Sequence, residues 1–139
     1  MFSKSNLIST LATAIWSCMG GFLLWGIIVD PFLQSHLGSA TGLMKEPIDV
    51  LFLIIGCVIQ GFAFSFIYSK WSQNNYSAGN GLSFGIWIGI LAGFGNGMID
   101  YATSNMLDLT GSLANALVYI VFFAIMGAIA GIVFKMTSK

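Results

Sequence analysis

Six polar side chains lie in or beside long apolar segments, where they could bind a cation or a proton: Asn96, Asp100, Asn115, Asp30, Asp49 and Gln60. Asn96 and Asp100 are four residues apart, so a helix places both on one face. Carboxylates and amides at membrane depth are typical of ion and proton pathways. The spacing therefore predicts a candidate cation or proton site around these two residues.

The other four residues are placed by counting along the predicted helices. Asn115 lies at a depth comparable to that of Asn96, and Asp30 and Asp49 lie just beyond it, whereas Gln60 lies several residues deeper. The alternative interpretation is that the acids are boundary residues, solvated or paired with Lys45. In that interpretation Gln60 makes an interhelical hydrogen bond. Both interpretations stay open at the level of sequence.

Other chemistries lack the residues they need. His36 is the only histidine, which excludes haem ligation by two histidines of this chain and leaves a zinc site without nitrogen ligands. No phosphate-binding loop, nucleophile elbow or metal-spaced Cys/His cluster is present. We therefore expect no catalytic residue, no metal and no cofactor, and a protein that is not an enzyme. Cys18 and Cys57 fall in apolar segments, where we expect reduced, packed thiols.

The composition is that of a membrane protein. Of 139 residues, 57 % are hydrophobic and only 7 % are charged, against about 25 % charged in globular proteins. The formal net charge is zero, so the basic surface of a nucleic-acid-binding protein is absent. Residues 1–139 are expected to form a single integral membrane domain whose main partner is the lipid bilayer.

Four segments are long enough to span about 30 Å of hydrocarbon: residues 7–29, 50–69, 81–101 and 112–134. The first is longer than the core of a signal peptide, so we expect an uncleaved helix. The fold class is all-α, a four-helix transmembrane bundle. The Asp30-Pro31 pair is expected to stop the first helix, and Thr110 and Ser112 are candidate caps of the fourth.

The lysines predict the orientation. Lys4, Lys70, Lys135 and Lys139 fall on one side of the four segments and only Lys45 on the other. By the positive-inside rule both termini are cytoplasmic, an N-in/C-in topology. Trp25 and Tyr101 near the opposite boundary fit an interfacial aromatic belt.

A ladder of glycines runs through the third segment at every fourth residue: Gly81, Gly85, Gly89, Gly93 and Gly97. Gly127 and Gly131 form a second ridge near the end of the fourth segment. Small residues let membrane helices approach closely, so these ridges are expected to pack inside the bundle or against another subunit. By depth, Gly127 and Gly131 are expected to meet only residues 81–89. Gly93 and Gly97 are left for another helix, a subunit or a bound group.

A shift of 71 residues superimposes Trp16 and Gly26 on Trp87 and Gly97, together with several aliphatic residues. One interpretation is an internal duplication into two parallel helical hairpins. The other is chance, since apolar segments often match. The shift alone does not distinguish them.

Trp16, the run from Gly20-Gly21 to Trp25-Gly26 and the glycine-rich third segment resemble the small four-helix inner-membrane proteins of bacteria that are classed as domains of unknown function. The resemblance implies a multi-pass protein of the bacterial cytoplasmic membrane. It supplies no catalytic residues.

Two functions follow as expectations. The first is a non-catalytic structural or accessory component that packs in a homo-oligomer or a larger membrane complex through the two glycine ridges. The second is a transporter or channel-like module that binds a cation or proton at the acidic and amide cluster. An enzyme acting on lipid or quinone finds no nucleophile–base pair in the sequence.

Overall fold

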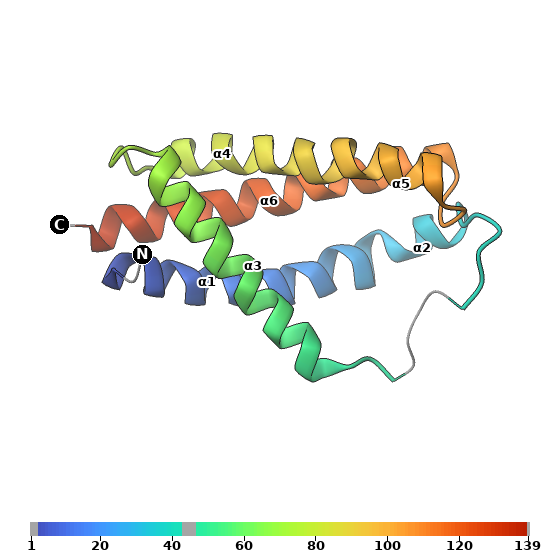
Figure 1. The fold of residues 1–139 in the computed structure, drawn as a ribbon, viewed down its shortest axis with the longest axis horizontal. Coiled ribbons are helices and arrows are strands. Elements are labelled where there is room, and N and C mark those ends of the chain that lie inside the picture. Colours follow the sequence, from blue (N-terminus) through green and yellow to red (C-terminus); the bar gives the residue numbers. More distant parts are fainter. Residues whose placement is uncertain (1–2, 43–46, 139) are drawn as a thin grey trace.

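The computed structural model describes residues 3–42 and 47–138, whose helices form an elongated bundle with both chain termini at one end (Figure 1). We call this the termini end and the opposite one the far end. The first pass consists of α1 (Lys4–Gly21) and the π-helical η1 (Phe22–Ile28), and the second of α3 (Val50–Trp71). The third joins α4 (Ala78–Ile90), η2 (Leu91–Asn96) and α5 (Gly97–Thr103), and the fourth is α6 (Leu109–Thr137).

Within the described residues, four helical spans are long and apolar enough to cross a membrane: Lys4–Ile28, Val50–Trp71, Ala78–Thr103 and Leu109–Thr137. The predicted all-helical, four-span architecture is confirmed. Three of the four spans start three residues earlier than predicted. Side chains that accept hydrogen bonds from the first turn fix these starts: Ser3, Asp49, Ser77 and Asp108.

One expectation about helix ends is wrong. Asp108, and not Thr110 or Ser112, caps α6, because its Oδ1 accepts from the Gly111 amide at 2.7 Å. The first pass ends at Ile28, just before Asp30-Pro31 as expected, and this pair opens a separate short helix, α2 (Asp30–Gln34). Proline is tolerated in a first turn, where its missing N–H would have no intrahelical partner.

The backbones of α4 and α6 lie in direct contact along most of the third pass. A Cβ atom added to Gly81 would collide with the Gly127 carbonyl, and one added to Gly85 would collide with that of Phe123. Gly131 faces Ser77 in the same way. Only glycine permits this approach, since any side chain would push the two helices apart.

The outer part of the ladder divides. A Cβ on Gly89 would lie 2.5 Å from the Ile120 Cα, and one on Gly93 would lie 2.5 Å from the Ala116 carbonyl oxygen. Gly97 has nothing within 4 Å. The expectation that Gly93 would be left for another helix or group is therefore wrong, because α6 runs beside the ladder as far as this residue.

Replacing Gly85 by valine is expected to destabilise the fold by about 3 kcal/mol, the upper range for overpacking a tight contact. Gly79→Val is the matched control, because Gly79 lies in the same helix with nothing within 4 Å. It should change stability by less than about 1 kcal/mol. Reversible unfolding in mixed micelles measures both, and equal effects would contradict the backbone contact.

The first two passes cross near the termini end. A Cβ on Gly61 of α3 would lie 2.8 Å from the Ala14 nitrogen of α1, so glycine is needed at this crossing too. Beside it, the Ser9 and Ser65 hydroxyls are 2.8 Å apart, and Thr13 donates to the Ser9 carbonyl at 2.7 Å. These buried hydroxyls are hydrogen-bonded, as polar groups away from water must be.

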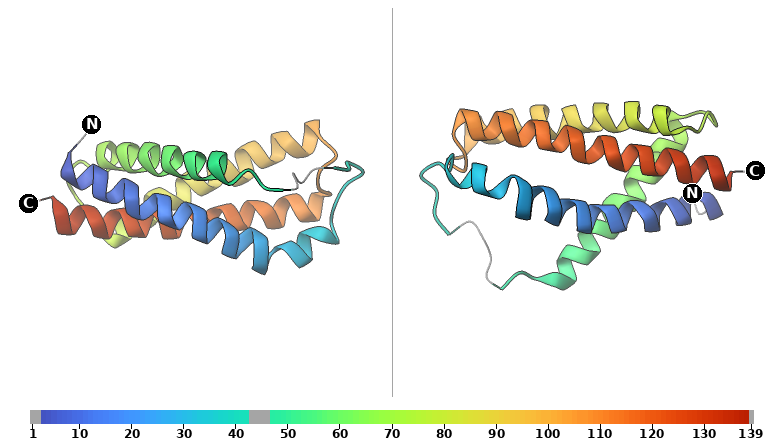
Figure 2. Two further views of the ribbon diagram at one scale, coloured as in Figure 1. Left: turned by 90° about the horizontal axis from the view of Figure 1, so that it is seen from below. Right: turned by 180° about the vertical axis from the view of Figure 1, so that it is seen from behind.

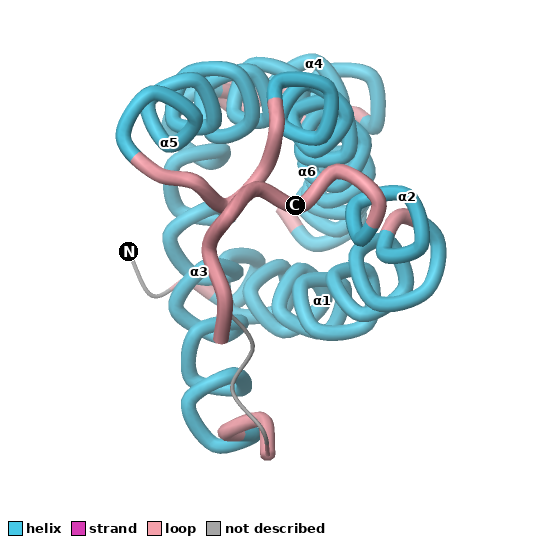
Figure 3. Tube along the Cα trace, turned by 90° about the vertical axis from the view of Figure 1, so that its right-hand side faces the viewer, coloured by secondary structure: helices cyan, strands magenta, loops and turns pink. Residues whose placement is uncertain are grey.

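Beyond this crossing α3 leaves the bundle. Its far-end half, residues 50–56, is exposed at every position, and it projects from the other three passes in the view along the bundle (Figure 3). The right-hand view of Figure 2 shows the same oblique course of α3 across α1. The α4–α6 hairpin is thus packed along most of its length, whereas the α1–α3 hairpin opens into a wedge.

Candidate functional site

The wedge between η1 and the far-end half of α3 forms an open cavity of about 500 Å³. Its walls come from α1, η1, α3 and α6. Its size falls within the range of ligand pockets, about 300–1,000 Å³. We call this space the wedge cavity.

Two hydrogen-bond donors face the wedge cavity at membrane depth. The Ser17 hydroxyl donates to Gln60 Oε1, which leaves the Gln60 Nε2 group without a partner among the described residues. Tyr119 also lines the cavity, and its hydroxyl has no hydrogen-bond partner in the described chain. Unsatisfied donors in hydrocarbon cost several kcal/mol, so this cavity favours an occupant that carries an acceptor.

Aromatic rings form the wall toward α6. The Trp25 ring lies 4.8 Å from that of Tyr119 and 5.3 Å from that of Phe122, measured between centroids. Trp25 Nε1 donates to Asn115 Oδ1 at 2.7 Å. Trp25 is therefore half-buried between helices and packs against α6.

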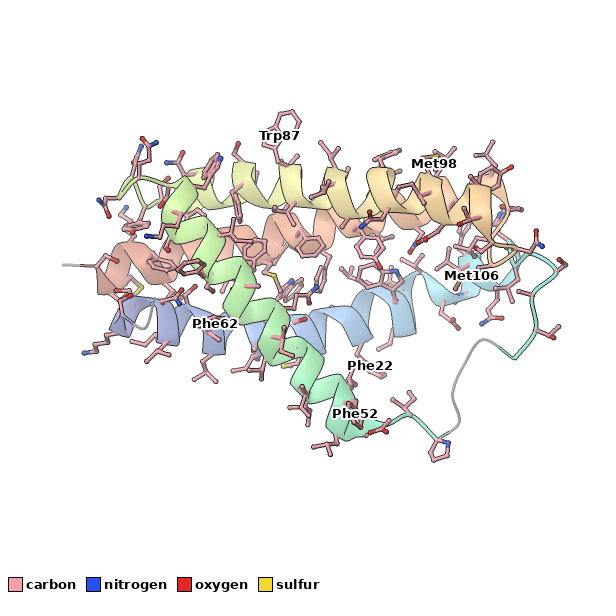
Figure 4. All side chains as sticks on the ribbon, in the orientation of Figure 1. Phe22, Phe52, Phe62, Trp87, Met98 and Met106 are labelled. Atoms are coloured by element: carbon pink, nitrogen blue, oxygen red, sulfur yellow. A yellow bond between two sulfur atoms is a disulfide. The ribbon has the colours of Figure 1, made fainter. Side chains whose placement is uncertain are left out.

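Two glycines of the wedge have open space where a side chain would stand. Gly21 and Gly56 both line the cavity, and neither has an atom within 4 Å of an added Cβ. Nearby, Phe22 and Phe52 lie at the open side of the wedge, away from α4 and α6 (Figure 4). The backbone is therefore accessible from the cavity at one glycine on each wall of the wedge.

A disulfide closes the narrow end of the wedge. Cys18 of α1 and Cys57 of α3 are bonded, with their Cα atoms 5.8 Å apart, and Cys57 lines the cavity. The expectation of reduced thiols is wrong, because the close crossing at Gly61 brings two residues 39 positions apart in sequence within bonding distance.

Protein purified without reductant and then denatured is expected to take up no maleimide, and two maleimides per chain after reduction. Intact mass spectrometry measures both states. The Cys57→Ser variant is the control, because it should take up one maleimide without reduction. Two adducts on the unreduced wild type would contradict the disulfide.

The predicted polar residues fall into separate places. Gln60 lines the cavity and Asn115 bonds to its Trp25 wall, whereas Asn96 and Asp100 are exposed on the third pass.

The remaining acids serve local structure. Asp30 accepts from Gln34 at 3.2 Å, and Asp49 accepts from the Phe52 amide at 3.3 Å as the cap of α3. Lys45, the predicted partner of the acids, and Glu46 lie outside the described residues.

A second polar contact joins two loops at the far end. Asp108 Oδ2 lies 2.8 Å from His36 Nδ1, and the Asp108 amide donates to the His36 carbonyl at 2.9 Å. The Gly111 amide and, to a lesser degree, the His36 side chain hold the pKa of Asp108 below its usual value. This contact fastens the loop after α2 to the start of α6. No group of three or more His, Cys, Asp or Glu side chains within the described ranges could hold a metal ion.

Sequence reasoning missed Ser17 as the partner of Gln60 and Trp25 as the partner of Asn115. Ser17 is the last of three hydroxyl residues spaced by four on α1, after Ser9 and Thr13, and this spacing was the available signal. No family model, curated protein or solved structure matches the chain. The site is therefore argued from its own residues.

Proposed function

We propose that the protein is a non-catalytic component of the membrane that acts by associating with a second copy of itself through the wedge. The observation that carries this proposal is the pair of open glycines, Gly21 and Gly56, on facing walls of the wedge. Small residues with free space beside them are what membrane helices use to approach each other. The glycines of the α4–α6 contact are already covered within the chain.

A second copy is the favoured partner because each chain carries both halves of the contact. The far-end half of α3 is exposed at residues 50–56 and has no close protein neighbour among the described residues. Beside it lies a wedge that no described residue occupies. A two-fold axis would lay the α3 arm of each copy into the wedge of the other, which closes the assembly. The Gln60 Nε2 group would then meet a carbonyl or side-chain acceptor of the partner helix.

The wider assignment rests on the arrangement of charge and on the resemblance described above. With Lys4, Lys70 and Lys135 at the termini end, we propose a bacterial cytoplasmic membrane with both termini in the cytoplasm. The far end and its acids then face outward. A duplication into two parallel hairpins remains part of the proposal, although one hairpin is closed and the other open.

Replacing Gly56 by leucine is expected to weaken self-association by about tenfold or more, because the new side chain stands where the partner helix must approach. The chain's own fold should be unaffected, since nothing lies within 4 Å of the added Cβ. Energy transfer between labelled copies in liposomes, at increasing dilution by lipid, measures the association.

Gly97→Leu is the matched control, because Gly97 is equally open but lies on the third pass, away from the wedge. It should associate as the wild type does. Energy transfer no greater than that of randomly mixed monomers in the wild type would overturn the proposal. An equal loss in both variants would also count against the wedge.

A cation or proton site is the second candidate, because Asn96 and Asp100 are both exposed, four residues apart, on the third pass. This site would contain fewer acids than the sequence suggested, because Asp30 accepts a hydrogen bond from Gln34 and Asp49 accepts one from the Phe52 amide. If the site acts in transport, Asp100→Asn should abolish any cation or proton flux into liposomes that the wild type supports. Asp30→Asn is the control and should leave the flux unchanged. A flux that persists in Asp100→Asn would exclude this function.

A further inference from the structure

A polar pocket of about 760 Å³ lies at the termini end, between the start of α1 and the ends of α3 and α6. It is remote from the wedge cavity and shares none of its lining residues. Its lining includes Lys4, Ser5, Lys70, Asn74, Tyr76, Phe134 and Ser138. We call it the basic pocket.

The charged residues that line the basic pocket are both positive. Lys4 and Lys70 both line it, and neither makes a salt bridge with any described residue. The carboxylates of the described part of the chain, Asp30, Asp49, Asp100 and Asp108, belong to the far-end turns and helix ends. Two lysine side chains therefore line one concave surface without a counter-charge from the described chain, which favours an anion.

The hydrogen-bonding groups fit the same anion. The Ser5 and Ser138 hydroxyls lie 3.2 Å apart across the pocket, and the Tyr76 hydroxyl donates to Asn74 Oδ1 at 3.2 Å. This contact orients the Asn74 amide, whose N–H groups make no hydrogen bond to the described chain. Hydroxyl and amide donors beside two lysines are suited to the oxygens of a phosphate group.

Apolar surface continues from the pocket toward the bilayer. Lys70 Nζ stands 5.8 Å above the Phe66 ring centroid, and the Tyr76 ring stacks on Phe134 at 4.9 Å. The pocket thus lies at the end of the membrane spans, where aromatic rings and lysine stems mark the boundary with the headgroups. An anion that carries acyl chains would contact both parts.

We propose that the basic pocket binds the phosphate of an anionic phospholipid in the adjacent leaflet. Lys4 and Lys70 hold the charge, and the hydroxyl and amide groups orient the phosphate oxygens. Basic pockets between membrane helices recognise headgroups in this way. The site is independent of self-association through the wedge.

The test uses the full chain reconstituted in vesicles of equal parts phosphatidylglycerol and phosphatidylcholine, then released in mild detergent for native mass spectrometry. The wild type should retain phosphatidylglycerol in preference to phosphatidylcholine. The Lys4→Gln/Lys70→Gln double variant should lose this retention by about tenfold or more, since each lysine near an anionic surface contributes about 1 kcal/mol.

Lys135→Gln is the matched control, because Lys135 lies at the same end, is exposed and does not line the pocket. It should retain phosphatidylglycerol as the wild type does. A second double variant, Lys4→Arg/Lys70→Arg, keeps both positive charges and should also retain the lipid. The proposal is overturned if the double glutamine variant retains the lipid, or if Lys135→Gln loses it equally. Displacement of the lipid by inorganic phosphate would show a small-anion site and would also overturn it.

Discussion

Direct backbone contact between α4 and α6 is the constraint on which the rest of the structure depends. Inside a bilayer no hydrophobic force draws helices together, so close packing must supply the association. Gly81, Gly85 and Gly127 bring two carbonyl-bearing surfaces within the reach of one another, and only the absence of Cβ atoms allows it. This rigid pair then offers α6 as the wall against which Trp16 and Trp25 of the first pass are fixed, through hydrogen bonds to Phe122 and Asn115.

The first hairpin has the opposite character. Its crossing is held by one close glycine contact at Gly61, a hydroxyl network and the Cys18–Cys57 disulfide, all toward the termini end or the centre. Beyond Cys57 nothing in the described chain draws α3 back, because residues 50–56 are apolar and lipid covers them as well as protein would. The wedge is therefore the physical result of stabilising contacts concentrated at one end of a helix pair. The disulfide fixes where the opening begins.

These two features give the protein two separate surfaces of different chemistry. The wedge combines bare backbone at Gly21 and Gly56 with an amide and a phenol that have spare donors, which suits a partner helix inside the bilayer. The basic pocket combines Lys4 and Lys70 with hydroxyls at the membrane boundary, which suits a headgroup. The two can be occupied at once, because they lie at opposite ends of α3.

The sequence alone determined the four spans and their boundaries to within a few residues, because the cost of placing each residue in hydrocarbon is local and adds along the chain. An even number of spans also determined that the termini share one end. The tertiary structure decided everything that depends on helix rotation and crossing angle. Gly93 contacts Ala116, Ser17 contacts Gln60, and Cys18 is bonded to Cys57. The hydropathy of a helix does not predict these pairs, because it does not change when the helix is rotated about its axis. Five of the six polar residues appeared to form one cluster, with Gln60 deeper, because depth was the only coordinate available from sequence. Rotation about each helix axis, which packing sets, separated Asp30 and Asp49 from Asn115 and Gln60.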